Sequence, residues 1–171
     1  MNYFELYEIP VALKVDTNTF KQKFYALSRK YHPDFFGNET EEEQAEALEK
    51  SSLVNKAFKT FNSLDETIKY VLQLKGLLQE EEKYKLPADF LMEVMELNEV
   101  LMEAKMVADE NKISELRSQI SSLQIALYET VKQIVESYKE GITSEKELLQ
   151  VKDYYYKKKY LDRILSSSNS H

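Results

Sequence analysis

Apolar residues recur every three or four positions over long stretches of this sequence, and few residues interrupt the pattern. Hairpins and β-turns rely on glycine, proline or asparagine at their corners, yet the 171 residues contain only three glycines and three prolines. The spacing is typical of amphipathic helices, and it predicts an all-α protein. The longest stretch without glycine or proline has this series on one face: Ile113, Leu116, Ile120, Leu123, Leu127, Val131, Ile134 and Tyr138.

The first 75 residues predict a short helix at 3–7 followed by a helical hairpin. The second helix begins near 16–18, among good N-cap residues, and ends at His32, because Pro33 disfavours a helical conformation in the residue before it. A capping box of Thr40 and Glu43 begins the third helix, and a weaker helix covers about 65–74. The second helix places Phe20, Phe24, Leu27 and Tyr31 on one face, and the third places Val54, Ala57, Phe58 and Phe61 on one face. The weaker helix packs Ile68, Val71 and Leu72.

Residues 76–87 are interpreted as a linker between a first domain at 1–75 and a second domain at 88–171. The linker contains an acidic run at 80–82, which we expect to be solvated. Three amphipathic helices follow: one at about 88–107, a long one that ends before Gly141, and a third that opens with a capping box of Ser144 and Glu147. Because their stripes can be buried only against one another, they predict an antiparallel three-helix bundle. The last helix carries apolar residues that include Leu148, Leu149, Val151, Tyr155, Tyr156 and Tyr160.

The chain contains no cysteine and two histidines, which limits the chemistry that it supports. The lack of cysteine excludes disulfides, and it excludes zinc or iron–sulfur sites held by cysteines of this chain alone. No apolar run reaches the roughly 18 residues that cross a bilayer, and the formal net charge of −7 argues against general nucleic-acid binding. His171 is the last residue, and we expect it to be disordered or part of a tag.

We expect the purified protein to bind no metal ion or cluster and to need no cofactor, because it lacks ligands of the usual softness and number. Elemental analysis after removal of any affinity tag measures this. Stoichiometric iron or zinc would contradict the expectation.

The tripeptide His32-Pro33-Asp34 lies between two helices whose lengths suit an antiparallel hairpin. Pro33 holds its two neighbours at a rigid corner, from which both side chains project. Upstream, Lys23 and Lys30 lie on one strip of the helix with Arg29 beside it, and we expect these cations to point away from the buried face. A basic helix that leads to such a corner fits an acidic partner.

Other interpretations of this corner stay open. His32 and Asp34 could form the general-base dyad of a hydrolase, although no activated nucleophile, phosphate loop or oxyanion donor accompanies them. The corner could also be an incidental turn in which a histidine caps a helix C-terminus, and the three cations could be a solvated face.

The first 75 residues resemble a J-domain. The resemblance rests on the short first helix, the basic second helix, the His-Pro-Asp loop and the stretch Asn55-Lys56-Ala57-Phe58 in the third helix. It implies that His32, Pro33 and Asp34, with Lys23, Arg29 and Lys30, stimulate ATP hydrolysis by a DnaK-type chaperone. Many J-domains have Lys or Arg after the Asp, whereas this chain has Phe35, so no charge contact is expected there.

The helix after Pro87 has more apolar surface than a three-helix core requires. One stripe suffices for the core: Phe90, Val94, Leu97, Leu101 and Ala104. A second strip follows around the helix: Leu91, Met95, Met102 and Met106, with Met92 at its edge, and beside it run Glu96, Glu99 and Glu103. Methionine suits adaptable binding surfaces, so an apolar strip edged by acids predicts a recognition surface. The alternative, that both strips are core, stays open.

Over its whole length the chain resembles the HscB-type J-domain co-chaperones of iron–sulfur cluster assembly. This resemblance implies a cytoplasmic adaptor, not an enzyme and without catalytic residues, that delivers an IscU-type scaffold protein to an HscA-type chaperone. The scaffold-binding residues that it implies are Leu91, Met92, Met95, Glu96, Glu99, Glu103 and Tyr160. A generic J-domain protein with a different client, and a structural helical protein with a chance His-Pro-Asp, remain alternatives.

Overall fold

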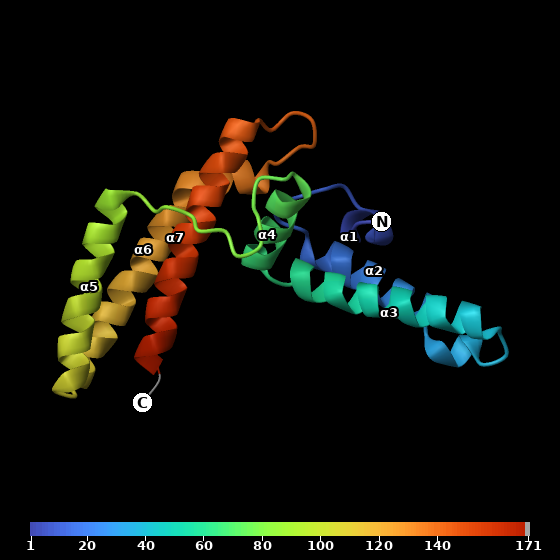
Figure 1. The fold of residues 1–171 in the computed structure, drawn as a ribbon, viewed down its shortest axis with the longest axis horizontal. Helices are drawn as coiled ribbons and strands as arrows, with labels where there is room; N and C mark the ends of the chain where they lie inside the picture. Colours follow the sequence, from blue (N-terminus) through green and yellow to red (C-terminus); the bar gives the residue numbers. More distant parts are fainter. Residues whose placement is uncertain (170–171) are drawn as a thin grey trace. The chain divides into compact units, whose positions relative to one another are not determined.

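The computed structural model describes residues 1–169, and all the regular secondary structure within them is helical, which confirms the predicted all-α class (Figure 1). His171 lies outside the described residues. The elements, in order, are α1 Tyr3–Tyr7, α2 Thr17–Lys30, the 3₁₀ helix η1 Pro33–Phe36, α3 Glu41–Phe61, α4 Leu64–Leu74, α5 Ala88–Met106, α6 Glu110–Glu136 and α7 Glu145–Asn169.

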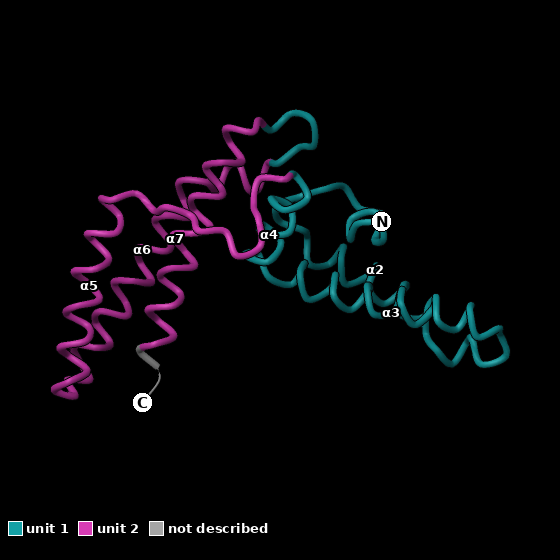
Figure 2. The backbone as a smooth tube through the Cα atoms, in the orientation of Figure 1, with its two compact units in different colours: residues 1–75, 138–143 teal, residues 76–137, 144–171 magenta. Residues whose placement is uncertain are grey.

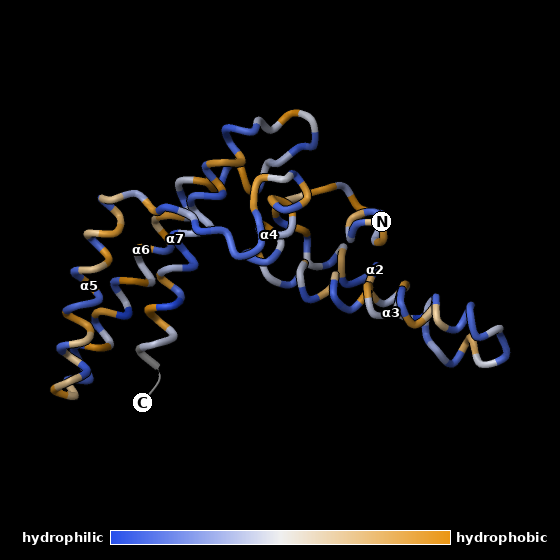
Figure 3. The backbone as a smooth tube through the Cα atoms, viewed as in Figure 1, coloured by the Kyte–Doolittle hydropathy of each residue, from blue (hydrophilic) through white to orange (hydrophobic). Residues whose placement is uncertain are grey.

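The chain divides into two compact units (Figure 2). The first unit is Met1–Lys75 together with Tyr138–Thr143, the segment that connects α6 to α7. The second unit is Gly76–Ser137 together with the segment that begins at Ser144. Apolar and polar residues alternate along the helices of both units (Figure 3), as amphipathic helices require.

Aromatic rings build the core of the first unit. Phe4, Tyr7 and Phe20 are buried, and the rings of all three lie within 6.1 Å of the buried Phe61 ring. The Tyr7 hydroxyl donates a hydrogen bond to the Val54 carbonyl at 2.7 Å, and burial raises the pKa of this hydroxyl. These contacts fix α1 against α3, and α2 packs beside them.

The predicted boundaries in this unit need small corrections. Helix α2 ends at Lys30 rather than at His32, because Tyr31 already leaves helical geometry and His32 is extended, with φ −63° and ψ 131°. This is the conformation that a residue before proline prefers. Of the predicted capping box on α3, the structure shows the bond from the Glu43 amide to the Thr40 hydroxyl, at 3.2 Å.

Helices α5, α6 and α7 form a bundle in the second unit. Its core joins the predicted stripe of α5 to α6 and α7, through Phe90, Val94, Leu101, Ala104, Leu116, Ile120, Leu161 and Ile164. The capping box before α7 is confirmed: the Glu147 amide donates to the Ser144 hydroxyl at 3.1 Å, and the Ser144 amide donates to the Glu147 carboxylate at 3.0 Å. On α7, Leu149 is exposed, whereas Tyr154, which the sequence analysis did not name, is buried.

The acidic run at 80–82 is not uniformly solvated, contrary to expectation. The Glu82 carboxylate lies 2.7 Å from the Lys152 ammonium, and both side chains are largely covered. The next contact is also to α7, since the Tyr84 hydroxyl donates to Asp153 at 2.7 Å and the Tyr84 ring stacks on Tyr156 at 4.5 Å. This part of the connecting segment is therefore held on α7.

We expect Glu82→Gln to lower the melting temperature at pH 7 by about 2–4 °C, the shift that about 1 kcal/mol produces in a chain of this size. The hydrogen bond to Lys152 holds the pKa of Glu82 below its usual value of 4.5. The ion pair therefore stabilises the fold above about pH 4.5, and this contribution is lost as the pH falls through the lowered pKa.

Thermal melts of both proteins between pH 3 and pH 7 measure this effect. The difference between them should shrink toward the acid end, and Glu81→Gln, at an exposed neighbour, serves as the control. A difference that does not change with pH would contradict the role of the carboxylate charge.

Candidate functional site

The tripeptide His32-Pro33-Asp34, called here the His-Pro-Asp corner, stands at the tip of the α2–α3 hairpin. Pro33 begins η1, and the His32 imidazole caps it by accepting a hydrogen bond from the Asp34 amide through Nδ1 at 3.2 Å. The Asp34 carboxylate lies 3.6 Å from the same nitrogen. Because Nδ1 is engaged locally, Nε2 remains as the group that the imidazole offers to a partner.

Both polar side chains of the corner are open to solvent. The His32 side chain is 55 % exposed and the Asp34 side chain is 86 % exposed. The turn itself is fixed by backbone, since the Phe35 amide donates to the His32 carbonyl at 3.0 Å. The corner thus presents a carboxylate and an imidazole on a rigid turn, with little involvement in the core.

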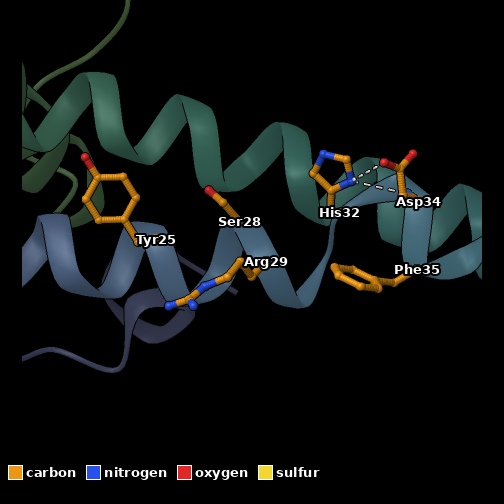
Figure 4. Close-up of a pocket in the computed structure, with 6 residues that line it drawn as sticks. All are labelled: Tyr25, Ser28, Arg29, His32, Asp34 and Phe35. Atoms are coloured by element: carbon orange, nitrogen blue, oxygen red, sulfur yellow. Dashed lines mark hydrogen bonds and ion pairs between the residues drawn. The ribbon is translucent and has the colours of Figure 1, made fainter.

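A groove of about 690 Å³ runs from the corner along α2, lined by Tyr25, Ser28, Arg29, His32, Asp34 and Phe35 (Figure 4). Tyr25 and Phe35 are both large, apolar and mostly exposed. Sequence reasoning missed Tyr25 and Ser28 and treated Phe35 only as a missing charge. Helical spacing was an available signal, because Tyr25, Arg29 and His32 follow one another at steps of four and three.

The three predicted cations of α2 do not share one surface. Arg29 lines the groove beside the corner. Lys23 and Lys30 lie instead on the side of α1, where the Lys23 ammonium is 4.0 Å from the Glu8 carboxylate. The Lys30 ammonium lies 5.3 Å from the centre of the Tyr31 ring. Lys30 and Arg29 are exposed and Lys23 is half-buried.

A second surface lies on α5, on the strip formed by Leu91, Met92, Met95, Met102 and Met106, called here the methionine strip. The four methionines are between 57 % and 85 % exposed, so the core interpretation is wrong for them. Leu91 is half-buried, and Glu96, Glu99 and Glu103 are exposed beside the strip. Two exposed valines that sequence reasoning did not include lie nearby: Val100 on α5 and Val107 directly after its last residue.

Tyr160, the last predicted scaffold-binding residue, lies on α7 rather than on α5. Its ring meets the buried Phe90 ring edge-on at 6.3 Å. It also lines a groove of about 410 Å³ that includes Leu91, so the structure brings these two predicted residues together.

Two further observations concern metal ligands and membrane-spanning helices. No group of three His, Asp or Glu side chains within the described residues could hold a metal ion. None of the helices in that part of the chain combines the length and the apolar character that crossing a membrane requires.

Known proteins match this chain along nearly its full length. The family model described as the HSCB C-terminal oligomerisation domain matches residues 86–168. A co-chaperone protein HscB homolog of Acinetobacter baumannii strain AYE is 31 % identical over 166 residues, which cover 97 % of this chain and 87 % of that protein. A co-chaperone protein HscB homolog of Neisseria meningitidis is 33 % identical over 132 residues, 77 % of this chain and 80 % of that protein.

The chain belongs to the HscB family. This confirms the family resemblance that the sequence predicted, and it makes the chain a co-chaperone of the HscB type.

Solved HscB structures share the fold. The crystal structure of human co-chaperone protein HscB matches with a TM-score of 0.80 and 28 % identity, over 98 % of this chain and 80 % of that one. The chaperone HscB from Vibrio cholerae matches with a TM-score of 0.65 at 24 % identity, over 98 % of this chain and 99 % of that one. The HscB family model begins at Leu86, just before α5, and so includes the methionine strip.

Proposed function

We propose that this HscB-family co-chaperone stimulates the ATPase of a DnaK- or HscA-type chaperone and delivers an IscU-type iron–sulfur scaffold protein to it. In this proposal, residues 1–75 act as the J-domain, 76–87 as the linker and 88–171 as the scaffold-binding bundle. The chain supplies binding energy and geometry, and the chaperone performs the hydrolysis.

The observation that carries the proposal is the exposure of the His-Pro-Asp corner. A carboxylate that is fixed by a proline turn and has only a local contact suits a charge-assisted bond to a basic group of a partner. The neighbouring groove adds the Arg29 guanidinium and the apolar surfaces of Tyr25 and Phe35. In the proposal, the corner and this groove together meet the chaperone.

The methionine strip supports the client half of the proposal. Exposed apolar side chains beside acids suit a partner with an apolar centre and a basic rim. In the proposal Leu91, Met92 and Met95 anchor the scaffold protein, while Glu96, Glu99 and Glu103 orient it. Because the strip and the His-Pro-Asp corner belong to different units, one chain could hold both partners at once.

The steady-state ATPase rate of an HscA-type chaperone, measured with and without this protein and the scaffold, tests the proposal. We expect the rate to rise with this protein and to rise further when the scaffold is added. A pull-down with the scaffold separates the proposal from a generic J-domain protein with another client. An unchanged ATPase rate, or no capture of the scaffold, would contradict the corresponding half of the proposal.

Reversal of two rim charges, Glu99→Lys with Glu103→Lys, should weaken scaffold binding about tenfold at low salt, mainly through a slower association rate. The effect should largely disappear near 0.5 M salt, because exposed charges are screened. Binding kinetics at several salt concentrations measure it. The matched control is Glu93→Lys with Glu115→Lys, two exposed acids of the same bundle outside the rim, and an equal loss in the control would contradict a specific rim.

A further inference from the structure

The groove of about 410 Å³ that contains Leu91 and Tyr160 has a composition unlike the methionine strip. One wall comes from the connecting segment, the start of α5 supplies Leu91, and α7 supplies the other wall. The walls are joined by the stacked rings of Tyr84 and Tyr156, whose centres are 4.5 Å apart and whose planes differ by 10°. The groove is therefore built on side chains that are held in place.

Four cations line this groove: Lys83, Lys85, Lys159 and Arg163. All four are exposed, and within the described residues none of them has a carboxylate partner. Other cations of α7 differ in this respect, because Lys152 pairs with Glu82, Lys157 with Asp153 and Lys158 with Asp162, at 2.7, 2.7 and 3.2 Å. The groove thus gathers unneutralised positive charge on a chain whose net charge is −7.

The one acid that lines the groove does not cancel this charge. Glu82 is committed to Lys152, which holds the pKa of the Glu82 carboxyl below its usual range. Hydrogen-bond donors are also available. The Tyr84 hydroxyl is used by Asp153, whereas the hydroxyls of Tyr156 and Tyr160 have no hydrogen-bond partner within the described residues.

We propose that this groove binds an acidic, extended segment of the client protein that docks on the methionine strip. The proposal rests on the proposed function, because Leu91 lines the groove and also belongs to the strip, so the two surfaces are continuous. The cations would pair with Asp or Glu side chains, and the tyrosines would pack against the chain between them. The net negative charge of the protein favours a short acidic segment over a long nucleic acid.

The client would then carry two opposite charges at defined places. A basic patch would face Glu96, Glu99 and Glu103 on one side of its apolar contact, and an acidic segment would enter the groove on the side of Leu91. Such an arrangement fixes the orientation of the client on α5, which an apolar strip alone does not do.

The test compares two double variants in calorimetric titrations with an IscU-type scaffold protein. Lys85→Glu with Arg163→Glu reverses charge in the groove. Lys132→Glu with Lys146→Glu changes the net charge equally at exposed positions elsewhere on the bundle. We expect the groove variant to bind about 10- to 100-fold more weakly at low salt, and the control to stay within about twofold of the parent protein.

Equal binding by the two double variants would overturn the groove proposal and leave the proposed function intact. Failure of the parent protein to bind the scaffold would instead overturn the proposed function. If the parent protein does not bind the scaffold, the groove is tested with a labelled peptide of six glutamates. This peptide should bind the parent and the control variant but not the groove variant. Equal binding of this peptide to all three proteins, or tighter binding of a DNA duplex of matched charge, would overturn the groove proposal.

Discussion

Replacement of His32 by Gln, or of Asp34 by Asn, is expected to remove nearly all stimulation of the partner chaperone while leaving the fold intact. The Asp34 side chain is 86 % exposed, and the interactions recorded for Asp34 within the described residues are with His32. Its loss should therefore change the free energy of unfolding by no more than about 0.5 kcal/mol. The loss of function is expected to be large. Asp34→Asn removes the charge that a basic group of the chaperone would meet, and His32→Gln removes the imidazole Nε2 that the corner presents.

Steady-state ATPase assays with scaffold present, together with thermal melts, measure both effects. Lys59→Gln is a matched control, since Lys59 is an exposed residue of α3 in the same unit. Full stimulation by either corner variant would refute the role of the His-Pro-Asp corner. A large fall in melting temperature would show that the corner is needed for folding instead.

The triple change of Leu91, Met92 and Met95 to Ala is expected to weaken scaffold binding by at least about 30-fold, the factor that corresponds to the 2 kcal/mol or more of a central anchor. Met92 and Met95 are 64 % and 58 % exposed, so their truncation leaves no cavity. Only Leu91 is half-buried, and we expect a correspondingly small loss of stability. Activation of the chaperone without scaffold should be unchanged.

Calorimetric titration beside thermal melts distinguishes an anchoring strip from a structural one. Ile125→Ala with Leu149→Ala is the control, because both residues are exposed apolar side chains elsewhere in the bundle. A severe loss of stability with scaffold affinity preserved would contradict the anchoring role. A structural, buried strip would give that outcome, because several large-to-small changes in a core lower the free energy of unfolding by several kcal/mol.

Much of the fold could be predicted from the sequence, because each helix carries its own periodic pattern and its own cap. The buried face of α4 and the core stripe of α5 are where the three-four spacing placed them. The sequence does not identify the buried face where that spacing fits more than one side of a helix. Helix α7 is apolar on several sides, so nothing local distinguishes the buried Tyr154 from the exposed Leu149.

The candidate sites were predictable only in part, for a related reason. A proline turn fixes the His-Pro-Asp corner locally, so the tripeptide was visible in the sequence. The groove beside it forms because Tyr25 on α2 and Phe35 on η1 come together in the fold, and no local pattern shows this. The pairing of Glu82 with Lys152 joins residues that are far apart in the chain, and no local pattern identifies such a partner.

The placement of the methionines has a consequence for damage by oxidants. All five methionines of the chain are exposed, and the chain has no thiol that could react first. Peroxide would convert these thioethers to sulfoxides, which are polar, and four of the five lie on the methionine strip. Oxidation would therefore make four of the five side chains of the methionine strip polar, while the packed interior, which contains no sulfur, stays chemically intact. Methionine sulfoxide reductases could then restore the surface without refolding the chain.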